Sequence, residues 1–278
     1  MREYLKGIYQ EKDLPGVFLG VVAGDDACLL IDTPLRLEES RDWLTQVELL
    51  GAPQFLVLLD SHPDRALGAR HFDLPCIAHL ATAKAMAAWS DTYKGTSDPI
   101  GAEADSVKRV TGLRRGVPDV IFHGEMMVEL TGRPVRLLER PGPTPGSIWV
   151  EVPDKETVYV GDAVTVNEPP YLGLADIEAW LTNLDRLREA PFDGYKVLSS
   201  RDGLVDRDQI NDMARFLRKV PVRVDRMDER ADPVGAADTF AAELIEDFKV
   251  TKARYDVALL RLRAGLLHLY RRGRPKGG

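Results

Sequence analysis

The sequence contains little cysteine, with Cys28 and Cys76 as the only two thiols in 278 residues. Both lie in apolar runs, ACLLID and LPCIAHL, without the spacing of metal ligands or of a disulfide framework. No apolar run is long enough to cross a membrane, and the first residues, MREYLKGIYQEKD, lack the apolar core of a secretory signal. We therefore expect buried thiols in a reducing compartment, and a soluble, cytoplasmic protein.

Basic residues are also in deficit, because 37 Lys and Arg face 44 Asp and Glu, for a net charge of -7. An acidic balance gives no electrostatic footprint for nucleic acid or for an anionic membrane. We expect a small-molecule ligand or substrate as the partner, with a homodimer left open. The hydrophobic fraction of 44% is ample for one large domain, or for one domain with an appendage.

Segments typical of strands and helices alternate in the first half of the chain. Residues 17–32 indicate two strands joined by a turn, and residues 55–60 a strand covered on both faces. Apolar side chains at helical spacing predict a helix at 37–50, and another is expected at about 64–72. The alternation predicts an α/β (α+β) fold, with two mixed sheets and helices outside them.

The second half is rich in strands and ends in helices. Strands are expected in MMVEL, VRLLERP, IWVEVP, TVYVGD and KVLSS, and an amphipathic helix over residues 175–189. The pattern is helical from Asp206, and residues 236–272 are expected to form a long helix or a helix pair. We therefore predict a main domain, 1–210, and a C-terminal helical segment, 211–278, packed on the same domain.

Several segments resemble, in order and spacing, the motifs of the metallo-β-lactamase superfamily. They are LLIDTP (29–34), LLDSHPDRALGARHF (58–72), RPGPTPGSIWVEVP (140–153) and VYVGDAV (158–164), with a weaker fifth, KVLSSRDGLVD (196–206). The second is similar to the segment that carries the His-x-His-x-Asp-His signature, and the third to the Pro-Gly-His-Thr-Pro-Gly-Ser segment. The resemblance covers about residues 15–210 and implies a four-layer αββα sandwich with a C-terminal helical extension.

In that family, His and Asp side chains at one edge of the sandwich hold one or two metal ions, which bind and activate water. The signature segment of this chain departs from the pattern. Its first His is Asp60 and its second is retained as His62, while its Asp is retained as Asp64 and the final His is Arg65. Two of the three imidazoles of the signature are therefore absent.

The later motifs also lack the histidine ligands of the family. The His of the Pro-Gly-His-Thr segment is Pro143, which has no side-chain ligand atom, and the bridging Asp is retained as Asp162. The His of the last Gly-His-Gly segment aligns with Arg201. Arginine is permanently charged and suits bidentate pairing with carboxylates. The resemblance thus implies guanidiniums where the family holds metal, and we expect no cofactor.

The charges of these residues support that interpretation. Three carboxylates face two guanidiniums, which leaves one negative charge when the single histidine is neutral and none when it is protonated. We expect a cluster that neutralises itself without metal, in a residual cleft where the arginines hold a small or anionic ligand. The residues expected to line this cleft are Asp60, His62, Asp64, Arg65, Asp162 and Arg201.

The alternative is a divergent hydrolase of esters, thioesters or phosphoesters that uses one divalent ion, Mn, Fe or Zn. This hypothesis requires Arg65 and Arg201 to point away from the ion, and its catalytic groups would be Asp64 and His62. The four metal ligands would be Asp60, His62, Asp64 and Asp162.

Metal-free acid/base catalysis is the third hypothesis, and it has no supporting motif. Neither Ser61 nor Ser200 lies in the Gly-x-Ser-x-Gly elbow that activates a serine nucleophile. The other histidines match no ligand position of the family, and we expect structural roles for them. They are His71, His79, His123 and His268.

Overall fold

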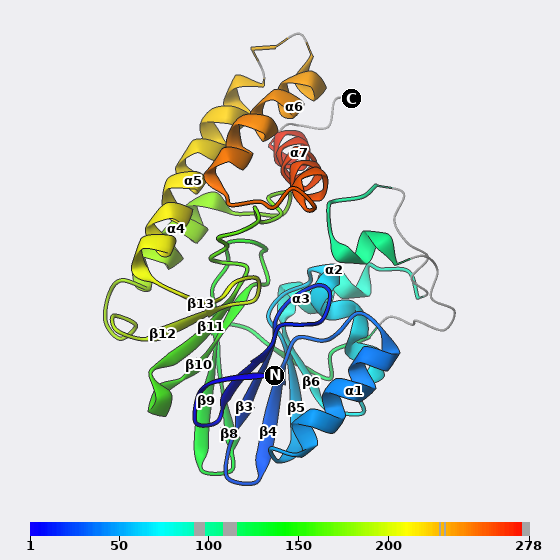
Figure 1. Ribbon diagram of the computed structural model, residues 1–278, viewed down its shortest axis with the longest axis vertical. Helices are drawn as coiled ribbons and strands as arrows, with labels where there is room; N and C mark the ends of the chain where they lie inside the picture. The colour runs from blue at the N-terminus through cyan, green and yellow to red at the C-terminus, as the bar shows by residue number, and fades with distance from the viewer. Residues whose placement is uncertain (92–97, 108–115, 228, 231, 274–278) are drawn as a thin grey trace.

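The computed structural model describes residues 1–91, 98–107, 116–227, 229–230 and 232–273. Two sheets face one another, and helices cover their outer faces (Figure 1). One sheet has seven strands in the order β1-β2-β3-β4-β5-β6-β7, and the other has six in the order β13-β12-β11-β10-β9-β8. The αββα sandwich expected from the motifs is therefore confirmed.

The first sheet combines an antiparallel half with a parallel half. Strands β1 to β4 pair antiparallel, whereas β4 to β7 pair parallel and need crossover connections. Its strands are β1 (Arg2–Leu5), β2 (Ile8–Glu11), β3 (Leu19–Ala23), β4 (Ala27–Ile31), β5 (Ala52–Leu58), β6 (Cys76–His79) and β7 (Val120–Phe122). The connections hold α1 (Leu37–Glu48), α2 (Pro63–Ala66), η1 (Leu67–His71), α3 (Leu80–Ala87) and η2 (Glu103–Ser106).

The second sheet is antiparallel except for one pair. Strands β11 and β12 run parallel, and the chain between them contains α4 (Ile177–Arg186). The strands are β8 (Glu125–Leu130), β9 (Arg133–Glu139), β10 (Ile148–Val152), β11 (Thr157–Gly161), β12 (Lys196–Ser199) and β13 (Gly203–Val205). A 3-10 turn, η3 (Pro153–Lys155), joins β10 to β11, and α5 (Arg207–Arg226) follows β13.

The strands β3, β4, β6, β10 and β11 are buried on both faces, which explains their continuous apolar runs. Val22 and Leu29 belong to the core between the sheets, whereas Val21 and Leu30 belong to the outer core under α1. In that outer core Trp43 of α1 is 1% exposed. Because successive side chains of a strand point to opposite faces, a two-sided core requires apolar residues at every position.

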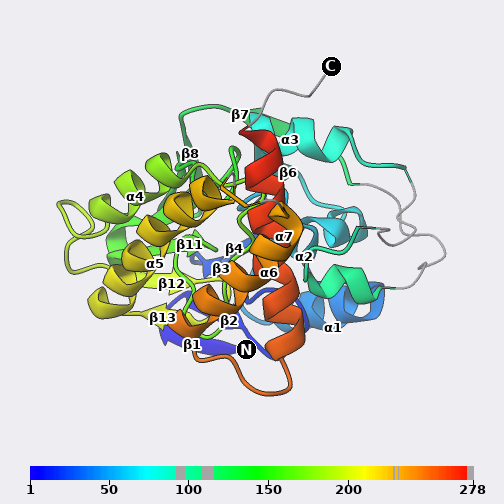
Figure 2. The same cartoon turned by 90° about the horizontal axis from the view of Figure 1, so that it is seen from above.

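The C-terminal helices lie across one end of the sandwich (Figure 2). They are α6 (Pro233–Leu244), η4 (Ile245–Asp247) and α7 (Tyr255–Arg272), so residues 236–272 form a helix pair rather than one helix. Phe240 and Leu262 share a core with Leu184 of α4 and Phe216 of α5. A division at residue 210 cuts α5, which packs on α4, so this helix belongs to both predicted parts.

The sequence patterns missed four short strands. The hairpin β1–β2 carries charged side chains at a sheet edge, with Arg2 and Glu3 exposed, and therefore lacks an alternating apolar signal. Strands β7 and β13 have three residues each, too few to show a period. KVLSS is consequently followed by one more strand, which pairs antiparallel with it.

Both cysteines are free and buried, as expected, and burial raises the pKa of the Cys28 thiol to about 11 and of the Cys76 thiol to about 12. Thiols with such values stay protonated and unreactive at neutral pH. In the described part of the chain, no helix combines the length and apolar character needed to span a membrane.

Candidate functional site

Charged side chains from the ends of four strands meet at one edge of the sandwich. Asp32 follows β4 and Asp60 lies just beyond β5, its parallel neighbour. Asp162 follows β11 and Arg201 lies just beyond β12, its parallel neighbour in the other sheet. The carboxyl ends of parallel strands lie at the same edge of a sheet, which brings these residues together. Gly161 ends β11 with a φ of +63°, a value that favours glycine, directly before Asp162.

Arg65 occupies the middle of this group and has no exposed surface. Its Nη1 donates to Asp32 Oδ2 at 2.8 Å, and its Nη2 donates to Asp162 Oδ1 at 2.5 Å. Its Nε lies 2.9 Å from Asp60 Oδ1, an ion-pair distance, although the N–H is not aligned for a hydrogen bond. One guanidinium is thus surrounded by three carboxylates from three different segments of the chain.

Arg201 connects the fourth carboxylate to the group. Its Nε and Nη2 donate to the two oxygens of Asp162 at 3.1 and 3.2 Å. Its Nη1 donates to Asp64 Oδ2 at 3.1 Å and to the Gly16 carbonyl oxygen at 3.0 Å. Charge-assisted, bidentate pairing of this kind is the strong form of the hydrogen bond. Asp162 therefore binds two guanidiniums, and Asp64 joins the network through Arg201.

His62 lies in the turn that leads into α2. Its backbone N–H donates to Asp60 Oδ1 at 2.8 Å, and its Nδ1 accepts the Asp64 N–H at 3.2 Å, which caps the helix. Because Nδ1 accepts, the proton of the neutral ring lies on Nε2. Burial lowers the pKa of His62, with a further contribution from Arg201, against the opposing effect of Asp64. The ring is accordingly neutral at pH 7.

The carboxylates of the network differ in proton affinity. Burial disfavours ionisation of Asp162, but Arg201 and Arg65 outweigh it and hold its pKa well below the ordinary value. Burial also opposes ionisation of Asp64, and Arg201 with the Ala104 N–H again lowers the net pKa. Asp32 differs, because burial together with nearby carboxylates raises its pKa to about 7, in spite of Arg65. The network contains more carboxylates than guanidiniums, and a proton on Asp32 reduces its net negative charge.

The loop of residues 140–147 borders the network from the second sheet. Pro143 is buried there and has no side-chain ligand atom. Ser147 Oγ lies 3.0 Å from Thr144 Oγ1 and donates to Asp60 Oδ2 at 3.5 Å. This loop therefore contributes a hydroxyl group, and no imidazole, to the neighbourhood of Asp60.

A further set of contacts connects the network to the C-terminal helices. The Ala104 N–H donates to Asp64 Oδ1 at 2.9 Å. Close by in the same segment, the Gly101 carbonyl oxygen accepts from Arg261 Nε and Nη2 at 2.9 and 2.7 Å. Arg261 lies on α7, is 3% exposed and also pairs with Glu168 at 3.1 Å. Through these contacts α7 supports the segment that holds Asp64.

All six side chains named as site residues from the sequence lie in this one network. Five of them are nearly inaccessible: Asp60, His62, Asp64, Arg65 and Asp162 expose 2%, 6%, 0%, 0% and 4% of their surface. Asp32 is a seventh member, and no role was predicted for it. Its segment, LLIDTP, resembles one of the family motifs, but the contact of Asp32 with the network depends on the pairing of β4 with β5, which appears only in the structure. The carboxylates of this network are therefore paired with the guanidiniums of Arg65 and Arg201, and are not free to act as metal ligands.

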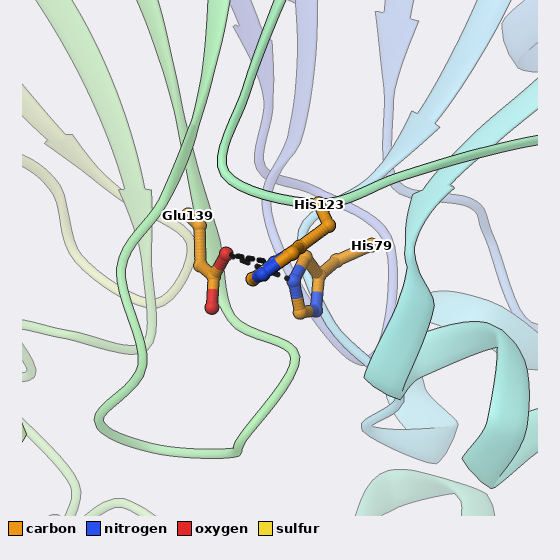
Figure 3. A group of neighbouring side chains, drawn as sticks. All are labelled: His79, His123 and Glu139. Carbon is orange, nitrogen blue, oxygen red and sulfur yellow. Dashed lines mark ion pairs between the residues drawn. The ribbon is translucent and has the colours of Figure 1, made fainter.

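A different group combines two histidines and a glutamate (Figure 3). Within the described ranges of the chain, His79, His123 and Glu139 are the residues of ligand type whose ligand atoms all lie within 4.8 Å of one another. His79 ends β6, His123 follows β7 and Glu139 ends β9. Both histidines were expected to be structural. The parallel neighbours β6 and β7 each lead into a histidine, but β7 is too short to show in the sequence and Glu139 lies in the other sheet, so the sequence held no signal for this group.

Comparison with known proteins agrees with the fold. A family model described as the metallo-β-lactamase superfamily matches residues 15–198. No curated protein matches the sequence.

Solved structures are similar over most of the chain. A metallo-β-lactamase family protein from Thermus thermophilus is 18% identical, with a TM-score of 0.65, over 99% of this chain and 97% of its own. The sec-alkylsulfatase Pisa1 from Pseudomonas sp. is 17% identical, with a TM-score of 0.67, over 97% of this chain and 49% of its own. A metallo-β-lactamase from Pontibacter korlensis is 18% identical, with a TM-score of 0.56, over 76% of this chain and 99% of its own. This chain spans about half the length of the alkylsulfatase, and these likenesses concern the fold alone.

Proposed function

This chain belongs to the metallo-β-lactamase superfamily, and we propose that a buried ion-pair network takes the place of the metal ions within it. The observation that carries the proposal is the Arg65 guanidinium, which has no exposed surface and contacts Asp32, Asp60 and Asp162. A divalent ion bound to Asp60 and Asp162 would lie beside this fixed positive charge. In a poorly solvated interior two such charges repel each other strongly.

The side chains at the family's ligand positions also argue against bound metal ions. Pro143 and Arg201 stand at two histidine positions of the family motif and supply no metal ligand. His62 uses Nδ1 as the acceptor of a helix cap. The residues present therefore fit a dinuclear zinc site poorly, and we propose a protein that is not a dinuclear zinc hydrolase.

We propose ligand binding as the function of this scaffold. Arg65 and Arg201 donate to carboxylates of their own chain, so an anionic ligand at the network would compete with those contacts. A groove of about 720 Å³ runs instead between the end of β9 and α4. Its lining includes Arg140, Asn183 and Arg186, side chains that can bind the polar groups of a small molecule. None of the residues that line this groove belongs to the network, which supports a ligand site outside the network rather than within it.

A second candidate is the hydrolase with one metal ion. Its support is the presence of four possible donors, the retained His62, Asp64 and Asp162 together with Asp60 in place of a histidine, and the structural likeness to proteins named as an alkylsulfatase and metallo-β-lactamases. It requires the guanidiniums of Arg65 and Arg201 to leave Asp162. A buried charge that loses its partners is strongly destabilising, which disfavours this arrangement.

The test is a comparison of metal uptake between this chain and the variant that combines Arg65→His, Arg201→His and Pro143→His. If guanidiniums have replaced metal on an intact scaffold, the variant gains Zn²⁺ binding in isothermal titration and a zinc-dependent rise in Tm. Because the measurement is the difference between the two chains, any ion bound elsewhere cancels. Equal uptake and equal melting shifts in both chains would contradict the proposal.

A further inference from the structure

The group formed by His79, His123 and Glu139 lies where the two sheets connect. His79 ends β6, while His123 and Gly124 form the link from β7 in the first sheet to β8 in the second. Glu139 ends β9, whose backbone pairs with this link: the Glu139 N–H donates to the Gly124 carbonyl oxygen at 2.8 Å. The three side chains therefore come from regular strand ends and from a link that backbone hydrogen bonds hold in place.

The carboxylate of Glu139 faces both rings, as Figure 3 shows. Its Oε2 lies 2.6 Å from His123 Nδ1 and 3.3 Å from His79 Nε2, and it accepts the Gly124 N–H at 2.7 Å. Burial raises the pKa of Glu139, but the Gly124 N–H and the two histidines outweigh it and hold the pKa below its ordinary value. The group thus presents an ionised carboxylate held in place by a backbone hydrogen bond.

His79 Nε2 is buried and lies 3.3 Å from Glu139 Oε2, without the alignment of a hydrogen bond. The residue is 4% exposed, and Nε2 makes no hydrogen bond although it points towards Glu139. A buried polar group without a hydrogen-bond partner destabilises a folded protein, and native structures contain few of them. Such an atom, beside a second imidazole and a carboxylate, needs an explanation.

We propose that His79 Nε2, His123 Nδ1 and Glu139 bind a divalent transition metal ion, with zinc as the best match. Two imidazoles and one carboxylate form a common set of three protein ligands for zinc, which leaves one coordination position for water or a ligand. Imidazole donors also favour zinc and its neighbours over magnesium or calcium. None of the three residues belongs to the network around Arg65, so this proposal can be tested independently of the proposed function.

Access from solvent is available on one side. The His123 side chain is 75% exposed, and the groove of about 720 Å³ described above includes Gly124 and Glu139 in its lining. An ion can therefore enter from the surface without unfolding the sandwich. A ligand in that groove, near Arg140, could reach the open coordination position, which suits an anionic group.

Metal binding at His79 changes one local hydrogen bond. In the structure His79 Nδ1 accepts the Ala81 N–H at 3.2 Å and caps α3, so the ring proton lies on Nε2. A metal ion at Nε2 requires this proton to move to Nδ1, and the Ala81 N–H then loses its acceptor. The loss of one helix cap is small beside the stabilisation that a zinc site provides.

The experiment is a titration of the chelator-treated full chain with Zn²⁺, followed by the visible spectrum of the Co²⁺ form. We expect about one ion per chain and a tetrahedral Co²⁺ spectrum. His123→Ala and Glu139→Gln should weaken binding at least about tenfold, as the loss of a metal-site contact typically does. The matched control is Glu125→Gln, which alters an exposed carboxylate that also borders the groove.

Amide exchange gives a second readout, because zinc should speed exchange at Ala81 in this chain and not in His123→Ala. The proposal is overturned if the parent chain binds no zinc, or if His123→Ala and Glu139→Gln bind it as tightly as the parent. If zinc binding persists in these variants and is lost in the Asp162→Asn variant, the ion lies at the Arg65 network. That result would contradict both this site and the proposed replacement of metal by ion pairs. Zinc absent from the parent and gained by the triple histidine variant would overturn this site alone.

Discussion

The Arg65 guanidinium lies 2.8 Å from Asp32 Oδ2, and neither side chain has any exposed surface. Each belongs to a segment that resembles a motif of the superfamily, one at the end of β4 and the other in α2. The pair shows that the positive charge at this edge of the sandwich is built into the polypeptide. A charge fixed in this way cannot be removed by a chelator, and its removal by mutation exposes the carboxylates to one another.

Arg65→Met is expected to destabilise the protein by about 3–5 kcal/mol, because the change leaves buried carboxylates without their partner. The free energy of unfolding in urea measures the effect. Arg215→Met is the control, since Arg215 pairs with Asp212 on an exposed face of α5, and its loss should cost about 0.5 kcal/mol or less. If the two substitutions have similar effects, the network does not stabilise the fold.

Asp32→Asn is expected to change the pH dependence of stability. The folded-state pKa of Asp32 is raised to about 7, above that of the unfolded chain, so the folded protein binds the extra proton. This group therefore contributes stability at about pH 5 that disappears as the pH rises through about 7.

The substitution removes that contribution. Compared with the parent, Asp32→Asn should be more destabilised at about pH 5 than at about pH 8 in urea unfolding at both values. A difference in stability that stays constant across this range would show that Asp32 keeps an ordinary pKa.

Arg261→Met is expected to loosen the contact between α7 and the segment that holds Asp64. Arg261 donates to the Gly101 carbonyl oxygen, and the nearby Ala104 N–H donates to Asp64. Hydrogen exchange at the Ala104 amide should become faster, because local opening no longer breaks the contacts of Arg261. Arg263→Met on the same helix, at an exposed position, should leave this amide unchanged. Unchanged exchange in both variants would mean that α7 does not support the network.

The architecture could be predicted because its signals are local and repeated. Residues 37–50 and 175–189 carry helical periodicity, and α1 and α4 were found within those ranges. The second half of β5 and the whole of β11 appear as continuous apolar runs, since both of their faces are covered. The hairpin β1–β2 carries neither signal, because its outer strand is charged and lies at an edge.

The candidate site was only partly predictable, because contacts between strand ends depend on pairing rather than on local pattern. The motif resemblance predicted that Arg65, Arg201 and their carboxylates lie together, and the structure has the same residues in contact. It gave no role to Asp32, whose position is set by the pairing of β4 with β5. His79 and Glu139 are far apart in the sequence and lie in different sheets, so their approach required the three-dimensional fold.

The measurement that tests the central claim most directly is a crystal structure of this chain grown with excess Zn²⁺ and recorded at the zinc absorption edge. We expect Arg65 in contact with Asp32 and Asp162, and no anomalous peak within coordination distance of either carboxylate, which is about 2.0–2.2 Å for zinc. A peak bound by Asp60, His62 and Asp162, with the Arg65 guanidinium displaced, would contradict the account and would restore a metal centre at this position.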